Sequence, residues 1–299
     1  MNSDFTILDG GMGRELHRMG APFKQPEWSA LALMLAPETV SKAHQRFVDA
    51  GAEVITTNSY ALVPFHIGEA KFETEGRKLA DLAGRLARKA AGSADHPLRV
   101  AGSLPPLFGS YRPDLFDEAK APAIIQPLIE GLSPHVDLWL AETQSCLAEA
   151  RFARQTLAGD KRPFWVSFTL DDDNADLARP KLRSGECAAA AVTAMLELGA
   201  DAVLFNCSQP EIMAGAVDAA RAVNEAHGFK ARIGVYANAF APQREDEAAN
   251  EAISDIRADL TPARYAQFAM DWRERGADII GGCCGIGPEH IAALRAMTS

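Results

Sequence analysis

The chain has 299 residues, of which 47% are hydrophobic and 23% are charged, a balance that excludes a disordered, collagen-like or coiled-coil protein. Its net charge of -10 gives no reason to expect a nucleic-acid partner. The N-terminus lacks the basic start and apolar run of a secretion signal. The most apolar stretch, residues 188–203, is interrupted by Glu197 and Asp201, so we expect a cytoplasmic protein without a membrane span.

A short pattern, Gly-Ala-acid-apolar-apolar, recurs three times, and each copy follows a stretch of helical character. The copies begin at Gly51, Gly199 and Gly276, so their first glycines lie 148 and 77 residues apart. Glycine after a helix takes the left-handed conformation that ends it, and the apolar residues beyond are typical of a buried strand. Each copy therefore predicts a helix-to-strand junction. The spacings are close to four and two units of about 37 residues, one eighth of the chain.

Eight apolar segments are predicted to be strands, and helical stretches separate most of them. In chain order the predicted strands are residues 6–8, 54–57, 99–102, 138–141, 165–168, 202–205, 233–236 and 279–281. The predicted helices are residues 37–50, 75–91, 123–135, 146–158, 186–198, 211–227 and 261–275. Eight such units without a break in composition favour a single-domain (β/α)8 TIM-type barrel over residues 1–299, rather than a doubly wound sheet with an appended domain.

Two irregular segments, residues 171–185 and 241–260, follow predicted strands. In a barrel, the loops that follow strands form the face that carries the active site. We therefore expect these two segments to border the site.

Three of the five cysteines fall directly after predicted strands. Cys207 follows the sixth, and Cys283 and Cys284 follow the eighth, whereas Cys146 and Cys187 fall in predicted helices, where we expect them to pack. Adjacent residues of a regular strand point to opposite faces, so both sulfurs of the pair can turn to one centre only if the chain bends. The glycines on either side of the pair allow such a bend.

These thiols suggest a three-sulfur zinc site, with two buried apolar side chains or a vicinal disulfide as the alternatives. A disulfide is disfavoured in a cytosolic chain of this size. Three thiolates leave the fourth tetrahedral position of zinc open, which is typical of a catalytic site. Such a centre carries a formal charge of about −1 and suits a thiol substrate, which it would hold as thiolate for attack on an electrophilic carbon. The implied chemistry is S-alkylation.

A second group of residues follows the first and fourth predicted strands. Asp9 and Glu142 would face the same barrel mouth, where two carboxylates can bind an ammonium group. The backbone N–H groups of the turn Gly10-Gly11-Met12 can hold a carboxylate. Together they would recognise an α-amino acid. The alternative is that both acids simply cap helices.

The chain resembles the zinc-dependent homocysteine S-methyltransferases along essentially its whole length. The resemblance rests on Leu8-Asp9-Gly10-Gly11-Met12, Thr57-Asn58-Ser59-Tyr60, Glu142-Thr143, Asn206-Cys207, Val235-Tyr236-Ala237-Asn238 and Gly281-Gly282-Cys283-Cys284-Gly285. It implies a (β/α)8 barrel whose zinc is bound by Cys207, Cys283 and Cys284, with the sulfur of homocysteine in the fourth position.

The same resemblance assigns the substrate contacts. It implies that Asp9 and Glu142 bind the amino group of homocysteine, and that Gly10, Gly11 and Met12 bind its carboxylate. Asn58 and Asn238 are expected to contribute to substrate binding. No catalytic residue beyond the zinc-bound thiolate is expected, because the metal holds the thiol deprotonated.

The expected reaction is methyl transfer from a sulfonium donor, S-methylmethionine or S-adenosylmethionine, to homocysteine, forming methionine. The expected partners are these small molecules alone, and the oligomeric state stays open. One alternative is an enzyme that uses a betaine-type donor. A second is the homocysteine-activating module of a split cobalamin-dependent methionine synthase, since we expect no corrinoid or folate domain in this chain. A third is a non-catalytic zinc-binding or redox-sensing barrel.

Overall fold

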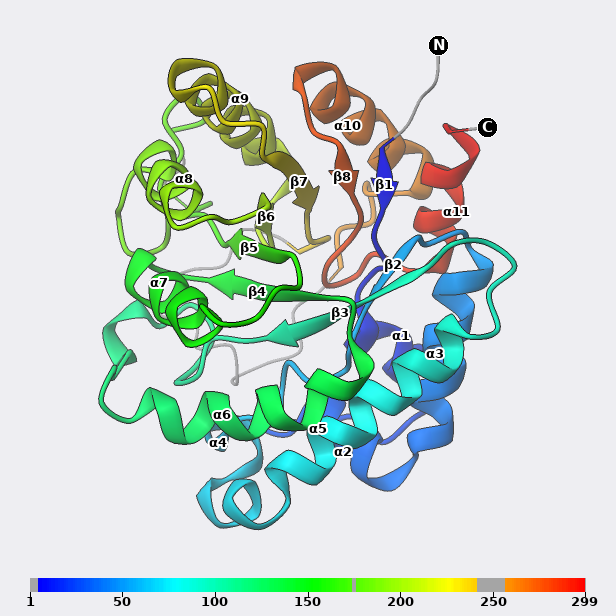
Figure 1. Cartoon of the computed structure of the whole chain (residues 1–299). Coiled ribbons are helices and arrows are strands. Elements are labelled where there is room, and N and C mark those ends of the chain that lie inside the picture. The colour runs from blue at the N-terminus through cyan, green and yellow to red at the C-terminus, as the bar shows by residue number, and fades with distance from the viewer. Residues whose placement is uncertain (1–4, 174–175, 241–255, 299) are drawn as a thin grey trace.

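In the part of the chain that the structure describes, eight parallel strands form one sheet, which curls into a barrel with the helices outside it (Figure 1). The computed structural model describes residues 5–173, 176–240 and 256–298. Hydrogen-bonded neighbours follow the order β1-β8-β7-β6-β5-β4-β3-β2. A parallel bridge between Leu8 and Val54 joins β1 to β2, and the N–H of Asp9 donates to the carbonyl of Val54 at 3.0 Å. The predicted single-domain TIM-type barrel is confirmed.

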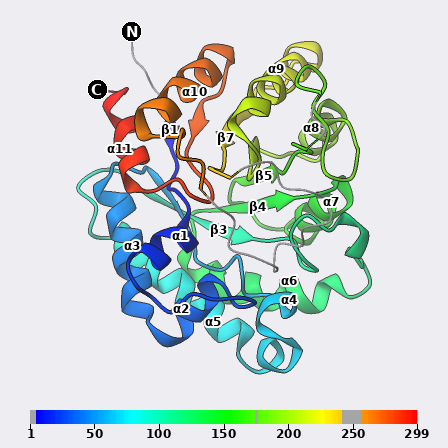
Figure 2. The same ribbon diagram turned by 180° about the vertical axis from the view of Figure 1, so that it is seen from behind.

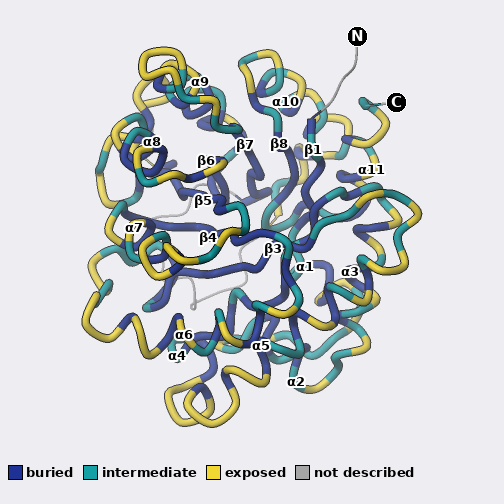
Figure 3. The backbone as a smooth tube through the Cα atoms, in the orientation of Figure 1, coloured by how far each residue is buried: buried dark blue, intermediate teal, exposed yellow. Residues whose placement is uncertain are grey.

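The strands agree with those predicted, with ends that differ by at most three residues. They are β1 (Thr6–Ile7), β2 (Val54–Thr56), β3 (Arg99–Leu104), β4 (Leu138–Gln144), β5 (Phe164–Phe168), β6 (Ala202–Asn206), β7 (Arg232–Tyr236) and β8 (Ile279–Ile280). Most of their residues are buried on both faces, which explains why they appear in the sequence as nearly continuous apolar runs (Figure 3).

Side chains alternate between the barrel interior and the layer under the helices. Along β4, Leu138 and Leu140 belong to the interior group, while Trp139 and Ala141 pack in the outer layer. The interior group consists of Leu8, Val54, Ala101, Leu138, Leu140, Trp165, Ala202, Leu204, Tyr236 and Ile279. The barrel is therefore a packed core, and a site can form only at its end.

The helices surround the sheet in both views (Figures 1 and 2). They are α1 (Met12–Arg18), α2 (Ser29–Leu35), α3 (Pro37–Asp49), α4 (Pro64–Ile67), α5 (Glu69–Ala91), α6 (Ala121–Leu132), α7 (Leu147–Thr156), α8 (Ala188–Glu197), α9 (Pro210–His227), α10 (Pro262–Arg275) and α11 (Pro288–Ala296). Short 3-10 turns span Pro113–Leu115 and Ser133–His135. Within the described residues, no helix is long and apolar enough to cross a membrane.

The junction glycines behave as the repeated pattern predicts. Gly51, Gly199 and Gly276 have φ values of 97°, 77° and 116°, the left-handed region in which glycine ends a helix. After each of them the chain enters β2, β6 or β8. The repeat therefore marks real αβ units.

The helix predictions need three corrections. Helix α5 begins at Glu69, six residues before the predicted start at residue 75. The predicted helix 123–135 ends at Leu132, where a 3-10 turn follows. Cys146 and Cys187 lie directly before α7 and α8, and Cys187 is exposed, so the expectation that it packs is wrong. Of the predicted loop 241–260, residues 241–255 lie outside the described residues.

Candidate functional site

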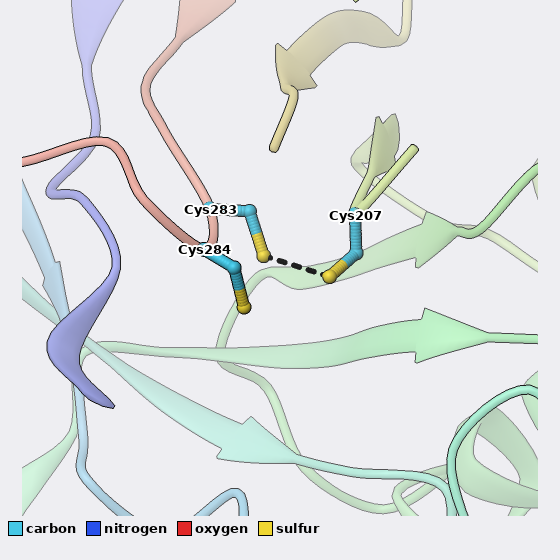
Figure 4. A group of neighbouring side chains, drawn as sticks. All are labelled: Cys207, Cys283 and Cys284. Carbon is cyan, nitrogen blue, oxygen red and sulfur yellow. Dashed lines mark hydrogen bonds between the residues drawn. The ribbon is translucent and has the colours of Figure 1, made fainter. Parts of the chain in front are cut away.

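The three cysteines predicted to act together meet at the carboxyl ends of the strands. Their sulfur atoms all lie within 4.8 Å of one another, and the Sγ atoms of Cys207 and Cys283 are 3.0 Å apart. Figure 4 shows Cys207 on one side and the adjacent pair opposite it, with the sulfurs of Cys207 and Cys283 pointing toward each other. In the parts of the chain that the structure describes, no other group of His, Cys, Asp or Glu side chains has this arrangement.

The bend at the cysteine pair depends on glycine, as the sequence indicates. Strand β8 ends at Ile280, and the chain then passes close to neighbouring segments. A Cβ on Gly281 would lie 2.3 Å from the Cβ of Leu8, and one on Gly282 would lie 2.1 Å from Cγ2 of Ile286. Any larger residue would displace this loop, and with it both sulfurs.

The thiols suit a soft divalent metal ion. Hydrogen bonds from Cys207 and Cys283 lower the pKa of the Cys284 thiol well below its ordinary value, and the charge of Arg14 adds to this effect. Contacts with Cys284 and burial raise the pKa values of the other two thiols, Cys207 and Cys283, so the metal-free cluster holds negative charge on one sulfur, that of Cys284. Thiolates are the ligands that soft transition metals prefer.

Asp9 is buried beside β2 and is not a helix cap. Its Oδ2 accepts hydrogen bonds from the N–H of Thr56 at 2.8 Å and from the Thr56 hydroxyl at 3.1 Å. Helix α1 begins at Met12 with Gly11 at its cap, so the capping interpretation of Asp9 is wrong. Burial raises the pKa of Asp9 to about 8, against the effect of these hydrogen bonds.

Glu142 lies within β4 and not after it, so it does not cap a helix either. The pairing of β4 with β5 shifts register between Ala141 and Gln144, and such a bulge redirects a side chain. The hydroxyl of Ser103 donates to Oε1 of Glu142, and the hydroxyl of Tyr236 donates to Oε2 at 3.4 Å. Burial raises the pKa of Glu142 to about 7.

The two carboxylates lie close enough to interact, since the charge of Glu142 contributes to the raised pKa of Asp9. In the described structure, the hydrogen bonds to both carboxylates come from neutral hydroxyl and amide groups. A cation placed between them would relieve the cost of burying negative charge. This arrangement suits an ammonium group.

The glycine turn serves the packing of the cysteine loop. A Cβ on Gly10 would lie 2.3 Å from the carbonyl oxygen of Ile286, and one on Gly11 would lie 2.5 Å from that of Cys283. The N–H of Gly11 donates to the carbonyl of Ile286 at 2.9 Å. Carboxylate binding by Gly10, Gly11 and Met12 stays a prediction, with the Gly11 N–H already engaged.

The two predicted asparagines are both buried but differ in their contacts. Asn58 donates to the carbonyl of Ser29 at 3.2 Å, which gives it a structural partner. Oδ1 of Asn238 accepts from the N–H of Phe240 at 3.2 Å, while its Nδ2 is buried without a partner in the described structure. An unpaired buried donor is costly unless a ligand completes it, so Asn238 is the better placed of the two for substrate.

Asn206 links the segment that carries Glu142 to the segment that carries Cys207, a role that the sequence did not reveal. Its Oδ1 accepts from the N–H of Thr143 at 3.1 Å and from the Ser167 hydroxyl at 2.7 Å, and its Nδ2 donates to the Thr143 hydroxyl at 2.8 Å. Thr143 has a φ of 59°, strained for a β-branched residue. Asn206 therefore holds the bulge beside Glu142 while standing next to Cys207 in the chain.

Tyrosine is the residue type that sequence reasoning missed. All four tyrosines are near the carboxyl ends of the strands: Tyr111 donates to the sulfur of Cys207 at 3.0 Å, and Tyr265 donates to the carbonyl of Gly281 at 2.6 Å. The other two are Tyr60 and Tyr236. The signal available in the sequence was their rarity, together with the position of two of them inside the motifs.

Known proteins resemble the chain over its full length. A family model described as homocysteine S-methyltransferase matches residues 6–298. Homocysteine S-methyltransferase 1 of Brassica oleracea is 29% identical, over 97% of this chain and 92% of its own. Homocysteine S-methyltransferase of Escherichia coli is also 29% identical, over 98% and 95%. The crystal structure of the metallated homocysteine methyltransferase MmuM from Escherichia coli superposes with a TM-score of 0.77 at 28% identity, covering 99% of this chain and 96% of that one.

Proposed function

Because the chain belongs to the homocysteine S-methyltransferase family, we propose that it transfers a methyl group from a sulfonium donor to the thiol of homocysteine, forming methionine. The donor we propose is S-methylmethionine or S-adenosylmethionine. The observation that carries the proposal is the meeting of three thiols within 4.8 Å at the strand ends, next to two buried carboxylates. We propose residues 1–299 as one homocysteine-binding domain.

The resident metal we propose is zinc, bound by Cys207, Cys283 and Cys284. Three thiolates are a ligand set that zinc accepts in tetrahedral geometry, and they leave one position for a substrate sulfur. The structurally similar Escherichia coli enzyme was crystallised in a metallated form, which supports a metal here. When bound, zinc would supply a Lewis acid that keeps the homocysteine thiol deprotonated near neutral pH.

The chain's own groups then position the amino acid. Asp9 and Glu142 would bind its ammonium group, which also offsets the mutual repulsion of the two carboxylates. The turn Gly10-Gly11-Met12 and the unpaired Nδ2 of Asn238 would face its carboxylate. We propose Asn58 as a further residue of the substrate site, with its Nδ2 donating to the carbonyl of Ser29. These contacts fix the direction from which the substrate sulfur meets the donor methyl.

The transfer itself needs no proton movement once the thiol is ionised. A lone pair of the homocysteine sulfur forms the new S–CH3 bond while the donor S–CH3 bond breaks. The bonding electron pair stays on the donor sulfur, which leaves as a neutral thioether. Consequently the site needs no general acid for the leaving group. The reduced thiols that this chemistry requires fit the cytoplasm, where we place the enzyme.

The test is a direct assay of zinc-loaded protein with homocysteine and each donor in turn, with methionine measured by chromatography. Methionine from S-methylmethionine or S-adenosylmethionine is the expected result. Betaine and a methylcobalamin-carrying protein are the comparison arms. Methionine from only one of those arms would refute the sulfonium donor, and methionine from none would refute the proposed activity.

A further inference from the structure

We infer that Tyr111 is a positioning residue that acts through Cys207, by donating a hydrogen bond which draws electron density from the metal-binding sulfur. Its hydroxyl lies 3.0 Å from that sulfur. The inference rests on the proposed function, because it takes Cys207 to bind the metal as a thiolate. Tyr111 lies in the loop between β3 and α6, and none of the sequence motifs that predicted the site includes this loop.

Both ends of this hydrogen bond have unusual backbone conformations. Tyr111 has a φ of 63° and Cys207 a φ of 52°, the left-handed region that residues other than glycine seldom occupy. Such backbone strain is costly and persists only where the surroundings impose it. Here the two strained residues are joined by the hydrogen bond from the Tyr111 hydroxyl to the Cys207 sulfur.

A closed chain of contacts holds the phenol against that sulfur. The guanidinium of Arg183 lies 4.5 Å from the centre of the Tyr111 ring. Nη2 of Arg183 donates to Oδ1 of Asp172 at 2.9 Å, and the side chains of this pair are only 8% and 1% exposed. Oδ2 of Asp172 accepts from the N–H of Gln209 at 2.9 Å. Gln209 is two residues after Cys207, so the contacts return to the strand end from which the sulfur comes.

The Tyr111 hydroxyl donates to the sulfur of Cys207. By comparison, the Nδ2 of Asn206 lies 4.0 Å from the sulfur of Cys283, which is a weaker contact. Hydrogen bonds to a ligand sulfur reduce the charge that it gives to the metal, and contacts of this kind tune metal sites. A metal that receives less charge from Cys207 retains more acidity for an incoming thiol. The Tyr111 hydroxyl would therefore favour homocysteine binding as thiolate.

The test is spectroscopic, and it uses the full chain loaded with cobalt(II) in place of zinc. In the Tyr111→Phe variant we expect the sulfur-to-cobalt charge-transfer absorption to move to lower energy, because the thiolate becomes easier to oxidise. The KM for homocysteine should rise about fivefold, which is less than the tenfold or more expected for losing a direct hydrogen bond to a charged group, because Tyr111 acts on the substrate only through Cys207 and the metal. The value of kcat should not fall, because the bound thiolate becomes the better nucleophile.

The matched control is Tyr60→Phe, which removes a phenol hydroxyl that pairs with Oγ of Ser110 at 2.6 Å and not with sulfur. Tyr60 lies near the charge of Cys207 without donating to its sulfur, so the absorption band of Tyr60→Phe should move less than that of Tyr111→Phe. As a second measurement, replacing Tyr111 with 3-fluorotyrosine keeps the ring and strengthens the donor, so the band should move to higher energy. This replacement keeps the inference testable if Tyr111→Phe fails to fold.

If the charge-transfer absorption is unchanged in both Tyr111→Phe and the 3-fluorotyrosine protein, the inference about Tyr111 is wrong, while the proposed metal centre is unaffected. A loss of kcat together with the rise in KM would also overturn it, since a merely structural role predicts that pattern. If the unmodified protein bound cobalt without any thiolate charge-transfer band, the proposed metal centre would fail, and this inference with it.

Discussion

Glu142→Gln tests whether the buried carboxylate binds the ammonium group of homocysteine. Glutamine keeps the volume of the side chain and an oxygen that accepts from Ser103 and Tyr236, but it lacks the charge. A hydrogen bond to a charged group contributes about 1.5–3 kcal/mol, so KM should rise between about tenfold and a hundredfold at pH 8. This rise measures the charge alone, because the shape of the site is preserved.

The ratio of KM between Glu142→Gln and the unmodified protein should also depend on pH, and this dependence is the more specific test. Burial raises the pKa of Glu142 to about 7, so at pH 8 the carboxyl is mostly ionised. At pH 6 only about one molecule in ten carries the charge, and the protonated acid resembles glutamine. The ratio of KM between variant and unmodified protein should therefore shrink about tenfold from pH 8 to pH 6. Using the ratio cancels the ionisation of the substrate thiol, which is common to both proteins.

The assay is steady-state KM for homocysteine at pH 6, 7 and 8 in both proteins, with calorimetric binding as a check. The comparison variant is Ser103→Ala, which keeps the carboxyl group but removes a hydrogen bond that lowers the pKa of Glu142. Its KM for homocysteine should therefore show the same dependence on pH, displaced to higher pH. A Glu142→Gln ratio that is constant from pH 6 to pH 8 would refute the role of the carboxylate charge.

Three further predictions follow from the same structure. Cys207→Ser should reduce bound metal and activity together by about a hundredfold, measured by atomic emission and the methionine assay, whereas Cys187→Ser at an exposed thiol should change neither. The pKa of Asp9 is raised from 3.8 to about 8 in the folded protein, so its contribution to stability is complete below pH 3.8 and is lost as pH rises through 8. In urea unfolding of the metal-free proteins, the unfolding free energy of Asp9→Asn should therefore decline less between pH 3.8 and pH 8 than that of the unmodified protein. An equal decline in the two proteins would contradict the assignment. Leu140→Ala, inside the barrel, should lower the unfolding free energy by about 2–5 kcal/mol, and a loss below 1 kcal/mol would mean that the interior is not packed as described.

The fold could be predicted because its signals are local. Gly51, Gly199 and Gly276 each end a helix at a left-handed position, and a buried strand follows within a few residues. Neither event depends on contacts far away in the chain. Short helices such as α1 and α4 gave no such signal, because seven or four residues are too few for a periodic pattern.

The site was only partly predictable, for a physical reason. The positions of Cys207, Cys283 and Cys284 follow from where strands end, which the sequence shows. The placement of Glu142 inside β4 depends on a bulge that Asn206 of β6 holds through hydrogen bonds to Thr143. No local sequence pattern indicates hydrogen bonds between residues so far apart in the chain. Tyr111 reaches the site from a loop and packs its ring against Arg183, which comes from a different loop, and no local pattern in the sequence indicates this contact.

The central claim is that three cysteines hold a metal whose remaining position takes the sulfur of homocysteine. X-ray absorption at the zinc edge measures this directly on the zinc-loaded protein. We predict three sulfur neighbours at about 2.3 Å without substrate and four after homocysteine is added. A sulfur count that stays at three with homocysteine bound would contradict the account.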